Sequence, residues 1–207
     1  MFKKILLVLG VFAFAFVILT VSILESSSIS YSFTAPTTPS NSDVKITEVN
    51  YVLPYAGRVL PDSPFWKLKA LRDKIWYFIT PSPLRKAELA LLFADKRLVS
   101  SRELLENGKA DLAISTLTKG EKYLETAVND EFVARKQGFD TSMFLSKLAT
   151  SALKHREVIE NLMPLIPEEG KPLIVKTEDY SKNAYKAARD ALNSTGLPLP
   201  FNPFVGD

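Results

Sequence analysis

The chain has 207 residues, 46% of them hydrophobic and 24% charged, which allows one folded domain of ordinary size plus a targeting segment. Lys3 and Lys4 are two of the 26 basic residues, and the other 24 nearly balance the 23 acidic residues, which argues against a nucleic-acid binder. The absence of Cys excludes disulfides, thiolate metal sites and Cys nucleophiles, and a single His excludes a metal site built from several histidines. We therefore expect no metal, no cofactor and no catalytic residues.

Residues 1–24 have the pattern of a signal anchor, because two lysines precede the uncharged run Ile5–Leu24. As a helix this run is about 30 Å long, the thickness of the hydrocarbon core of a bilayer. The lysines favour a cytoplasmic N-terminus, so we expect the rest of the chain outside the cytoplasm, at the cell membrane. The alternative is a cleaved signal peptide, cut near Ser28–Ser30, which would release a secreted domain.

Residues 25–43 are rich in Ser, Thr and Pro, a composition that predicts a flexible stalk rather than a packed segment. The extracytoplasmic domain is then expected over 44–195, with a Pro-rich tail over 196–207. The domain begins with a broken alternation of apolar residues over 44–53, which predicts an extended segment or a short strand laid against helices.

Apolar periodicity then predicts an all-α bundle of about five helices. The first runs over 64–79, after a Ser63 cap, and its expected apolar face is Phe65, Leu68, Leu71, Ile75, Trp76 and Ile79. The second runs over 83–107, and the third begins at about 110. Asn107–Gly108 is a helix stop, so Gly108 is the expected turn of an antiparallel hairpin between the second and third helices.

The remaining helices are predicted over about 140–163 and 172–193. The fourth has an apolar stripe that contains the single histidine: Leu145, Leu148, Ala152, His155, Ile159 and Leu162. The fifth is rich in Ala and less hydrophobic, so we expect it to pack at the periphery. The apolar side chains of the tail either dock on the bundle or offer a peptide ligand.

An ordered series of residues resembles a bacterial envelope family known as domain of unknown function 5667. The resemblance covers about residues 51–127 and rests on Leu60–Pro64, Lys67–Lys69, Arg72, Trp76, Thr80–Pro83, Lys86–Glu88, Ala94–Leu98, Gly108, Lys109 and Ala113. The family has no assigned activity, so the resemblance implies an exported, mostly helical module and nothing catalytic.

The hairpin also resembles a single degenerate tetratricopeptide unit. The residues that fit are Ser101, Leu104, Ala113, Leu117 and Gly120, placed around the turn at Gly108. Arg97 stands where that repeat usually has an aromatic residue, and we find no second copy. Because such repeats need about three units to bury a continuous core, a plain helical hairpin is the preferred interpretation.

Three groups of side chains are candidates for function. His155 is either a histidine at the edge of the core or a pH sensor that would charge between pH 5 and 7 and loosen the bundle. Asp95 recurs with Glu88 and Arg102 every seven residues, which predicts a solvated face of ion pairs, and Arg72 is its expected partner across the helix contact. Trp66, Trp76, Tyr77 and Phe78 cluster in one helix, either as core or as a membrane-interface contact.

These observations predict a membrane-anchored, non-enzymatic module for protein–protein interaction or scaffolding at the cell envelope. Its partners would be the membrane, through residues 1–24, and an envelope or secreted protein; its oligomeric state is left open. The alternatives are a structural surface protein without a dedicated partner, and a pH-responsive helical module that uses His155.

Overall fold

The structure is a computed structural model that describes residues 48–204. This part of the chain forms five α-helices and no strand, so the predicted all-α class is confirmed for it. The helices are α2 (Trp66–Ile79), α3 (Pro83–Glu106), α4 (Ala110–Lys136), α5 (Ser142–Leu162) and α6 (Lys171–Ser194), with two short 3-10 turns, η1 (Met163–Leu165) and η2 (Glu168–Gly170), before α6.

The predicted anchor and stalk, residues 1–24 and 25–43, lie outside the described residues. Within residues 48–204, no helix combines the length and the apolar character needed to cross a bilayer.

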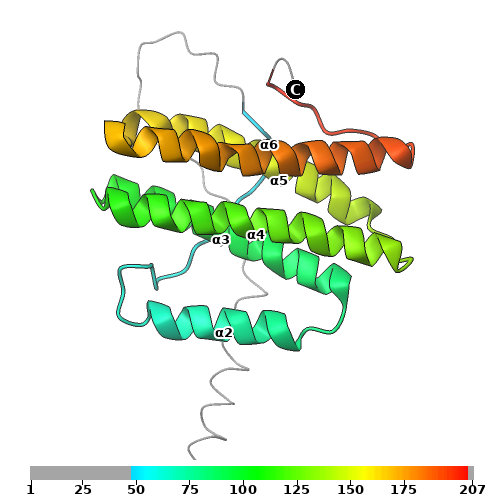
Figure 1. The fold of residues 1–207 in the computed structure, drawn as a ribbon, viewed down its shortest axis with the longest axis horizontal. Helices are drawn as coiled ribbons and strands as arrows, with labels where there is room; N and C mark the ends of the chain where they lie inside the picture. The colour runs from blue at the N-terminus through cyan, green and yellow to red at the C-terminus, as the bar shows by residue number, and fades with distance from the viewer. Residues whose placement is uncertain (1–47, 205–207) are drawn as a thin grey trace, which may run out of the picture. The chain divides into compact units, whose positions relative to one another are not determined.

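The helices lie in three layers, with α2 on one side, α3 and α4 in the middle, and α5 and α6 on the other side (Figure 1). The most extensive helix contact is between α3 and α4, followed by that between α5 and α6. Two antiparallel pairs therefore stack on each other, and α2 lies outside the α3–α4 pair.

The turn between α3 and α4 is a Schellman motif. Gly108 has φ +73°, the left-handed conformation that glycine adopts without a steric penalty. The amide of Lys109 donates to the carbonyl of Leu104, and the amide of Gly108 donates to that of Leu105, both at 2.9 Å. The predicted turn at Gly108 is thus confirmed.

Of the two helix starts for which the sequence predicts a serine cap, one is confirmed and the other is wrong. Ser82 caps α3 ahead of Pro83, and its hydroxyl accepts from the amide of Arg85. The predicted cap at Ser63 is wrong: α2 begins at Trp66, and the hydroxyl of Ser63 accepts instead from the amide of Phe65, which is not part of the helix.

The core consists of two apolar clusters, each built from α3, α4, α5 and α6. One contains residues such as Leu91, Leu124, Leu148 and Leu192, and the other contains Leu98, Leu117, Ile159 and Ile174. Alanines on the helix stripes let the helices approach closely; they include Ala87, Ala94, Ala152, Ala184 and Ala188, all buried.

Helix α6 was expected at the periphery, and that prediction is wrong. Ile174, Ala184, Ala188, Ala191 and Leu192 are buried against α4 and α5. Small side chains suit a close helix contact as well as an exposed surface, so the low hydrophobicity of this segment did not distinguish the two.

The orientation of α2 is also opposite to the prediction. Of the six residues expected to face the core, only Trp76 is half-buried; Phe65, Leu68, Leu71, Ile75 and Ile79 are exposed. The only buried residue of α2 is Asp73. The helix therefore packs with its mixed polar and aromatic side on the bundle and its apolar side outward.

The described chain ends on the bundle at both termini. Residues 48–65 cross from α5 to α2 as an irregular segment, and the predicted strand is absent from it; Val49 is buried within it. In the tail, Leu197 and Phe204 pack against the first cluster, while Phe201 remains 84% exposed. Docking of the tail is confirmed for these two residues only.

Candidate functional site

A layer of buried polar side chains separates the two apolar clusters at the middle of the bundle. Asp95 comes from α3, Glu121 from α4 and His155 from α5, and each lies between residues of the two clusters along its own helix. Ser151, one turn before His155 on α5, is also buried. At the same level α6 contributes Thr177, Glu178 and Ser181, also buried. We call the group of Asp95, Glu121, Ser151 and His155 the polar layer.

His155 lies between two carboxylates. Its Nδ1 is 2.6 Å from Oε1 of Glu121, and its Nε2 is 3.0 Å from Oδ1 of Asp95. The side chains of His155 and Glu121 have no exposed surface, and that of Asp95 has almost none. Because a carboxylate accepts hydrogen bonds, both ring nitrogens can donate only when the imidazole is protonated.

This arrangement favours the charged form of His155. Burial lowers the pKa of His155, but the charge of Glu121 and the hydrogen bonds to both carboxylates outweigh burial and raise the pKa to about 10. The sequence-based prediction that His155 is neutral and charges between pH 5 and 7 therefore does not fit its surroundings. His155 is also fully buried at the centre of the core, so the predicted position at the edge of the core is wrong.

Asp95 connects the polar layer to the segment that precedes α2. Its Oδ1 also accepts from Ser151 Oγ at 2.8 Å, and its Oδ2 accepts from the hydroxyl of Tyr51 at 2.7 Å. Burial, together with the charge of Asp95, raises the pKa of Tyr51 above its usual range. Nearby, the amide of Val49 donates to Glu157 at 2.6 Å. The segment is thus held by acceptors on both α3 and α5.

The predicted ion pairs around Asp95 take another form. Asp95 is buried, so the expected solvated face is wrong for this residue, although Glu88 pairs with Arg85, and Arg102 lies 3.7 Å from Glu106. Arg72 makes a 2.7 Å ion pair with its neighbour Asp73, whereas both oxygens of Asp95 accept from Tyr51, Ser151 and His155.

The sequence analysis missed Glu121 and Ser151 of the polar layer, and it missed Tyr51, which donates to Asp95. Glu121 lies four residues after Leu117 and three before Leu124, which is the spacing of a buried stripe. Gly120 beside it fits the same spacing, so the pattern did not single out Glu121 as the buried residue. A carboxylate and a histidine that each lie on an apolar stripe were the signal that could have paired α4 with α5.

A second candidate site is the exposed side of α2. We define the α2 outer face as Phe65, Leu68, Leu71, Ile75, Phe78 and Ile79, all exposed; Phe78 is 82% exposed and Leu68 67%. The prediction that Trp66, Trp76, Tyr77 and Phe78 form core is therefore wrong for Phe78. Scattered exposed apolar residues are ordinary, but these six, five on α2 and one directly before it, form a strip along one side.

The opposite side of α2 holds the helix on the bundle through aromatic and polar contacts. Arg97 lies over the rings of Trp66 and Tyr123, at 5.8 and 4.3 Å from the ring centres. The rings of Trp76 and Phe93 meet edge to face at 6.2 Å. The hydroxyl of Tyr77 donates to Asp130 at 2.6 Å. These contacts attach α2 without using its outer face.

Lys69 connects α2 to the irregular segment before it. Its Nζ donates to the carbonyls of Ala56 at 2.7 Å and Val59 at 3.0 Å. Burial lowers the pKa of Lys69 to about 8. The ammonium therefore ties α2 to the preceding loop from the packed side of the helix.

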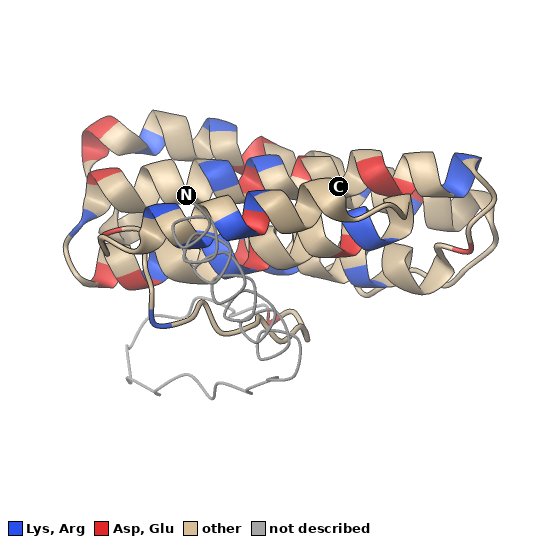
Figure 2. Ribbon diagram, turned by 90° about the horizontal axis from the view of Figure 1, so that it is seen from below, with Lys and Arg blue, Asp and Glu red and all other residues tan. Residues whose placement is uncertain are grey.

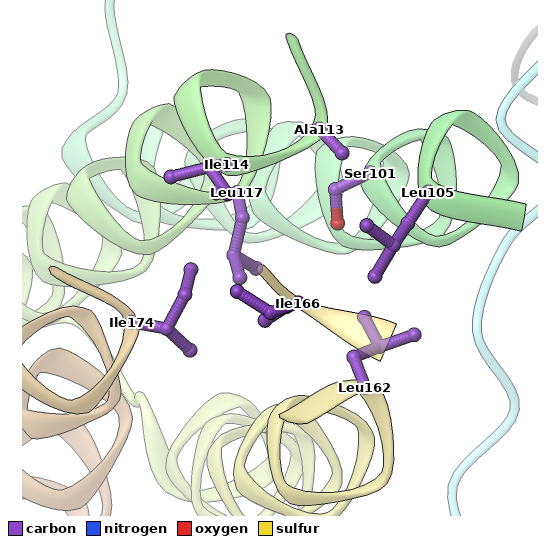
Figure 3. A pocket seen from close by; sticks show the side chains of 8 residues that line it. All are labelled: Ser101, Leu105, Ala113, Ile114, Leu117, Leu162, Ile166 and Ile174. Carbon is purple, nitrogen blue, oxygen red and sulfur yellow. The ribbon is translucent and has the colours of Figure 1, made fainter. Parts of the chain in front are cut away.

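A small cavity lies between the two helix pairs, and it is apolar. Eight side chains from α3, α4, α5, the turn after α5 and α6 point into it from both sides (Figure 3): Ser101, Leu105, Ala113, Ile114, Leu117, Leu162, Ile166 and Ile174. About 10 Å³ is open to the centre of a water molecule, roughly the room for a single water. The one polar group, the hydroxyl of Ser101, donates to the carbonyl of Leu98. This space fits neither a substrate nor an acyl chain.

The family model described as "Domain of unknown function (DUF5667)" matches residues 58–169, which is more than half of the chain. The chain belongs to this family. No curated protein and no solved structure matches the chain. The match begins at residue 58 and extends well beyond residue 127, where the sequence-based resemblance ends, so that it also includes α5 and all four residues of the polar layer. A tetratricopeptide-like character of the α3–α4 hairpin is not confirmed.

The boundaries of the DUF5667 match divide the bundle unevenly. The match ends at residue 169, before α6, although α6 supplies part of both core clusters. It begins at residue 58, after Tyr51, whose hydroxyl donates to Asp95. In this member of the family, the matched region is therefore completed by contacts from segments on both sides of it.

Proposed function

We propose that this DUF5667 member is a non-enzymatic interaction or scaffolding module. In this proposal residues 1–24 tether it to the cell membrane with the helical domain outside the cytoplasm, and the α2 outer face contacts another component of the envelope. The observation that carries the proposal is the apolar strip from Phe65 to Ile79, exposed on a bundle whose core closes without it.

The polar layer supports a structural role for the only histidine. His155 and Glu121 are sealed from solvent, so a substrate atom has no access to the imidazole in this structure. Buried charged groups that bond across helices specify which residues pair, because a shifted register leaves a charge unpaired. The layer thus serves to align α3, α4 and α5 so that the bundle can present α2.

Site-specific labelling in native envelopes tests this proposal. The chain has no Cys, so a single cysteine introduced by F78C on the α2 outer face, or by N183C on exposed α6, reacts alone with a membrane-impermeant maleimide. We expect F78C to label several-fold more slowly than N183C. Equal labelling of both sites would contradict the proposal and favour a surface protein without a dedicated partner.

A further inference from the structure

The α2 outer face is apolar in its middle and basic along one side. Four basic residues and one acidic residue lie between Phe65 and Ile79. The acidic one, Asp73, is buried and paired with Arg72, whereas Lys67 and Lys74 are exposed. The exposed charges that α2 itself presents beside this face are therefore positive.

The sign of these charges discriminates between occupants. A second copy of the chain packed with its α2 antiparallel would bring its own Lys67 and Lys74 beside the same pair, which places like charges together. An anionic phospholipid surface complements them, and a basic helix with Phe and Leu on one side is typical of helices that lie in a membrane interface. Figure 2, seen from the side on which α2 lies in Figure 1, shows acidic and basic positions interspersed along the rest of the bundle.

The length of α2 suits an interfacial position. Fourteen residues give a helix of about 21 Å, too short to span a hydrocarbon core of about 30 Å. Its aromatic residues Trp66, Trp76 and Tyr77 are half-buried on the packed side, so the rotation of the helix is fixed and the side chains of the α2 outer face point away from the bundle.

The chain between the predicted anchor and the domain is long enough for this arrangement. Residues 25–47 number 23, which reach at most about 80 Å when extended. Three layers of helices at 8–10 Å spacing amount to roughly 30 Å. The reach therefore allows α2 to lie on the same membrane that holds the anchor.

We propose that the α2 outer face inserts shallowly into the membrane that carries the anchor, with Lys67 and Lys74 against anionic phospholipid headgroups. This inference rests on the proposed membrane tether, and it names the lipid surface as the envelope component that covers α2. The bundle would then have a fixed orientation, with the α5–α6 layer turned away from the bilayer.

The test uses the purified full chain in proteoliposomes of phosphatidylglycerol and phosphatidylcholine. An environment-sensitive fluorophore is attached at F78C or, as the control, at N183C, and its reaction with an aqueous reductant is timed. The N183C signal also gives the fraction of domains that face outward. We expect the F78C label to emit at shorter wavelength and to react several-fold more slowly than the N183C label.

Two further variants, each carrying the F78C label, test whether the proposed contacts protect the fluorophore from the reductant. L68E/L71E replaces exposed apolar residues of the same face, and K67E/K74E reverses the flanking charge. L68E/L71E should bring the reaction rate close to that of N183C. K67E/K74E should lower protection in vesicles with phosphatidylglycerol and leave it unchanged in vesicles of phosphatidylcholine alone.

The outcomes separate this inference from the proposal on which it rests. A chain that alkaline carbonate extracts from the vesicles would contradict the tether itself. If the chain is retained and F78C reacts as fast as N183C, the lipid contact is overturned, and protection seen in native envelopes would then be due to a protein. The lipid contact would be overturned in favour of a second copy by two results together. The label at F78C would be better protected from the reductant as the amount of protein per vesicle rises, and unlabelled F78C would form disulfide-linked dimers.

Discussion

The bundle of α3–α6 and the single helix α2 distribute polar and apolar side chains in opposite ways. The bundle encloses His155 between two carboxylates, while α2 turns Leu68 and Phe78 outward. In the bundle, opposite charges and hydrogen bonds offset the cost of burying polar groups. On α2, the described residues offer no apolar surface to cover the strip. The first arrangement specifies how helices align, and the second indicates contact with something outside the domain.

The largest expected effect comes from removing the cation of the polar layer. H155L leaves the carboxylate of Glu121 buried, with no other hydrogen-bond partner for either oxygen among the described residues. Loss of one member of a buried pair typically costs about 3–5 kcal/mol of the free energy of unfolding. Urea unfolding of the full chain in micelles, followed by circular dichroism, measures the loss.

The matched control is E121L/H155L, which removes the carboxylate together with its partner. We expect this double variant to regain part of the stability, because Glu121 no longer leaves an unpaired charge and Asp95 keeps its hydrogen bonds from Tyr51 and Ser151. A double variant as unstable as H155L would show that volume and packing, rather than the unpaired charge, explain the loss.

Truncating one leucine in each region sharpens the comparison. Leu148 is fully buried and Leu71 is 54% exposed. L148A should lower the free energy of unfolding by about 2–5 kcal/mol, since it leaves a cavity, whereas L71A should change it by less than about 0.5 kcal/mol. The same urea titration compares them. A loss above 1 kcal/mol for L71A in the absence of membrane would mean that the α2 outer face stabilises the bundle itself.

The stability of the bundle should also fall at alkaline pH. The folded pKa of His155, about 10, is higher than the 6.5 of an ordinary histidine, so its contribution is fully present below pH 6.5 and is lost as pH rises through 10. The free energy of unfolding should decrease in this window by up to about 1.4 kcal/mol per pH unit. Unfolding titrations between pH 6.5 and 10 provide the measurement.

The E121L/H155L variant isolates the histidine in that experiment. Asp95 and Tyr51 remain in this variant. On α6, Glu178 forms ion pairs with Lys182 at 2.9 Å and with Arg156 at 3.5 Å, and these pairs are present in both proteins. Lys69 also titrates in the window, with the opposite sign because its pKa is lowered, but it contributes to both proteins. Parallel pH profiles of the two proteins would refute a charged His155.

The smallest expected effect is at the hairpin turn. G108A places a side chain at φ +73° and should cost about 1–2 kcal/mol, the usual penalty of the left-handed conformation. Its neighbour Asn107, at φ −87°, is the control, and N107A should change stability by less than about 0.5 kcal/mol. Equal effects of the two substitutions on urea unfolding would show that the turn geometry is not what Gly108 contributes.

The sequence-based predictions were accurate where they depended on residues close in sequence, and they failed where residues far apart in sequence meet. Ser82, Pro83 and Gly108 act on amides within one turn, so the start of α3 and the turn into α4 were predicted. The apolar stripe predicted for the fourth helix, α5, also lies where the spacing indicated, with Leu145, Leu148 and Ile159 buried. For the site, the sequence pointed to His155 and Asp95 separately but did not join them.

The helical class, most helix ends and the apolar stripe of α5 could be predicted from local patterns, because these depend on neighbours one to four residues apart. Three features depend on how the helices come together. Asp95 and Glu121 meet His155 only when three helices converge. The small residues of α6 are buried because α4 and α5 offer a close contact. The α2 outer face stays exposed because α3–α6 complete their core without it, so the surface left for α2 is one that Trp66, Lys69 and Tyr77 fit better than leucines do.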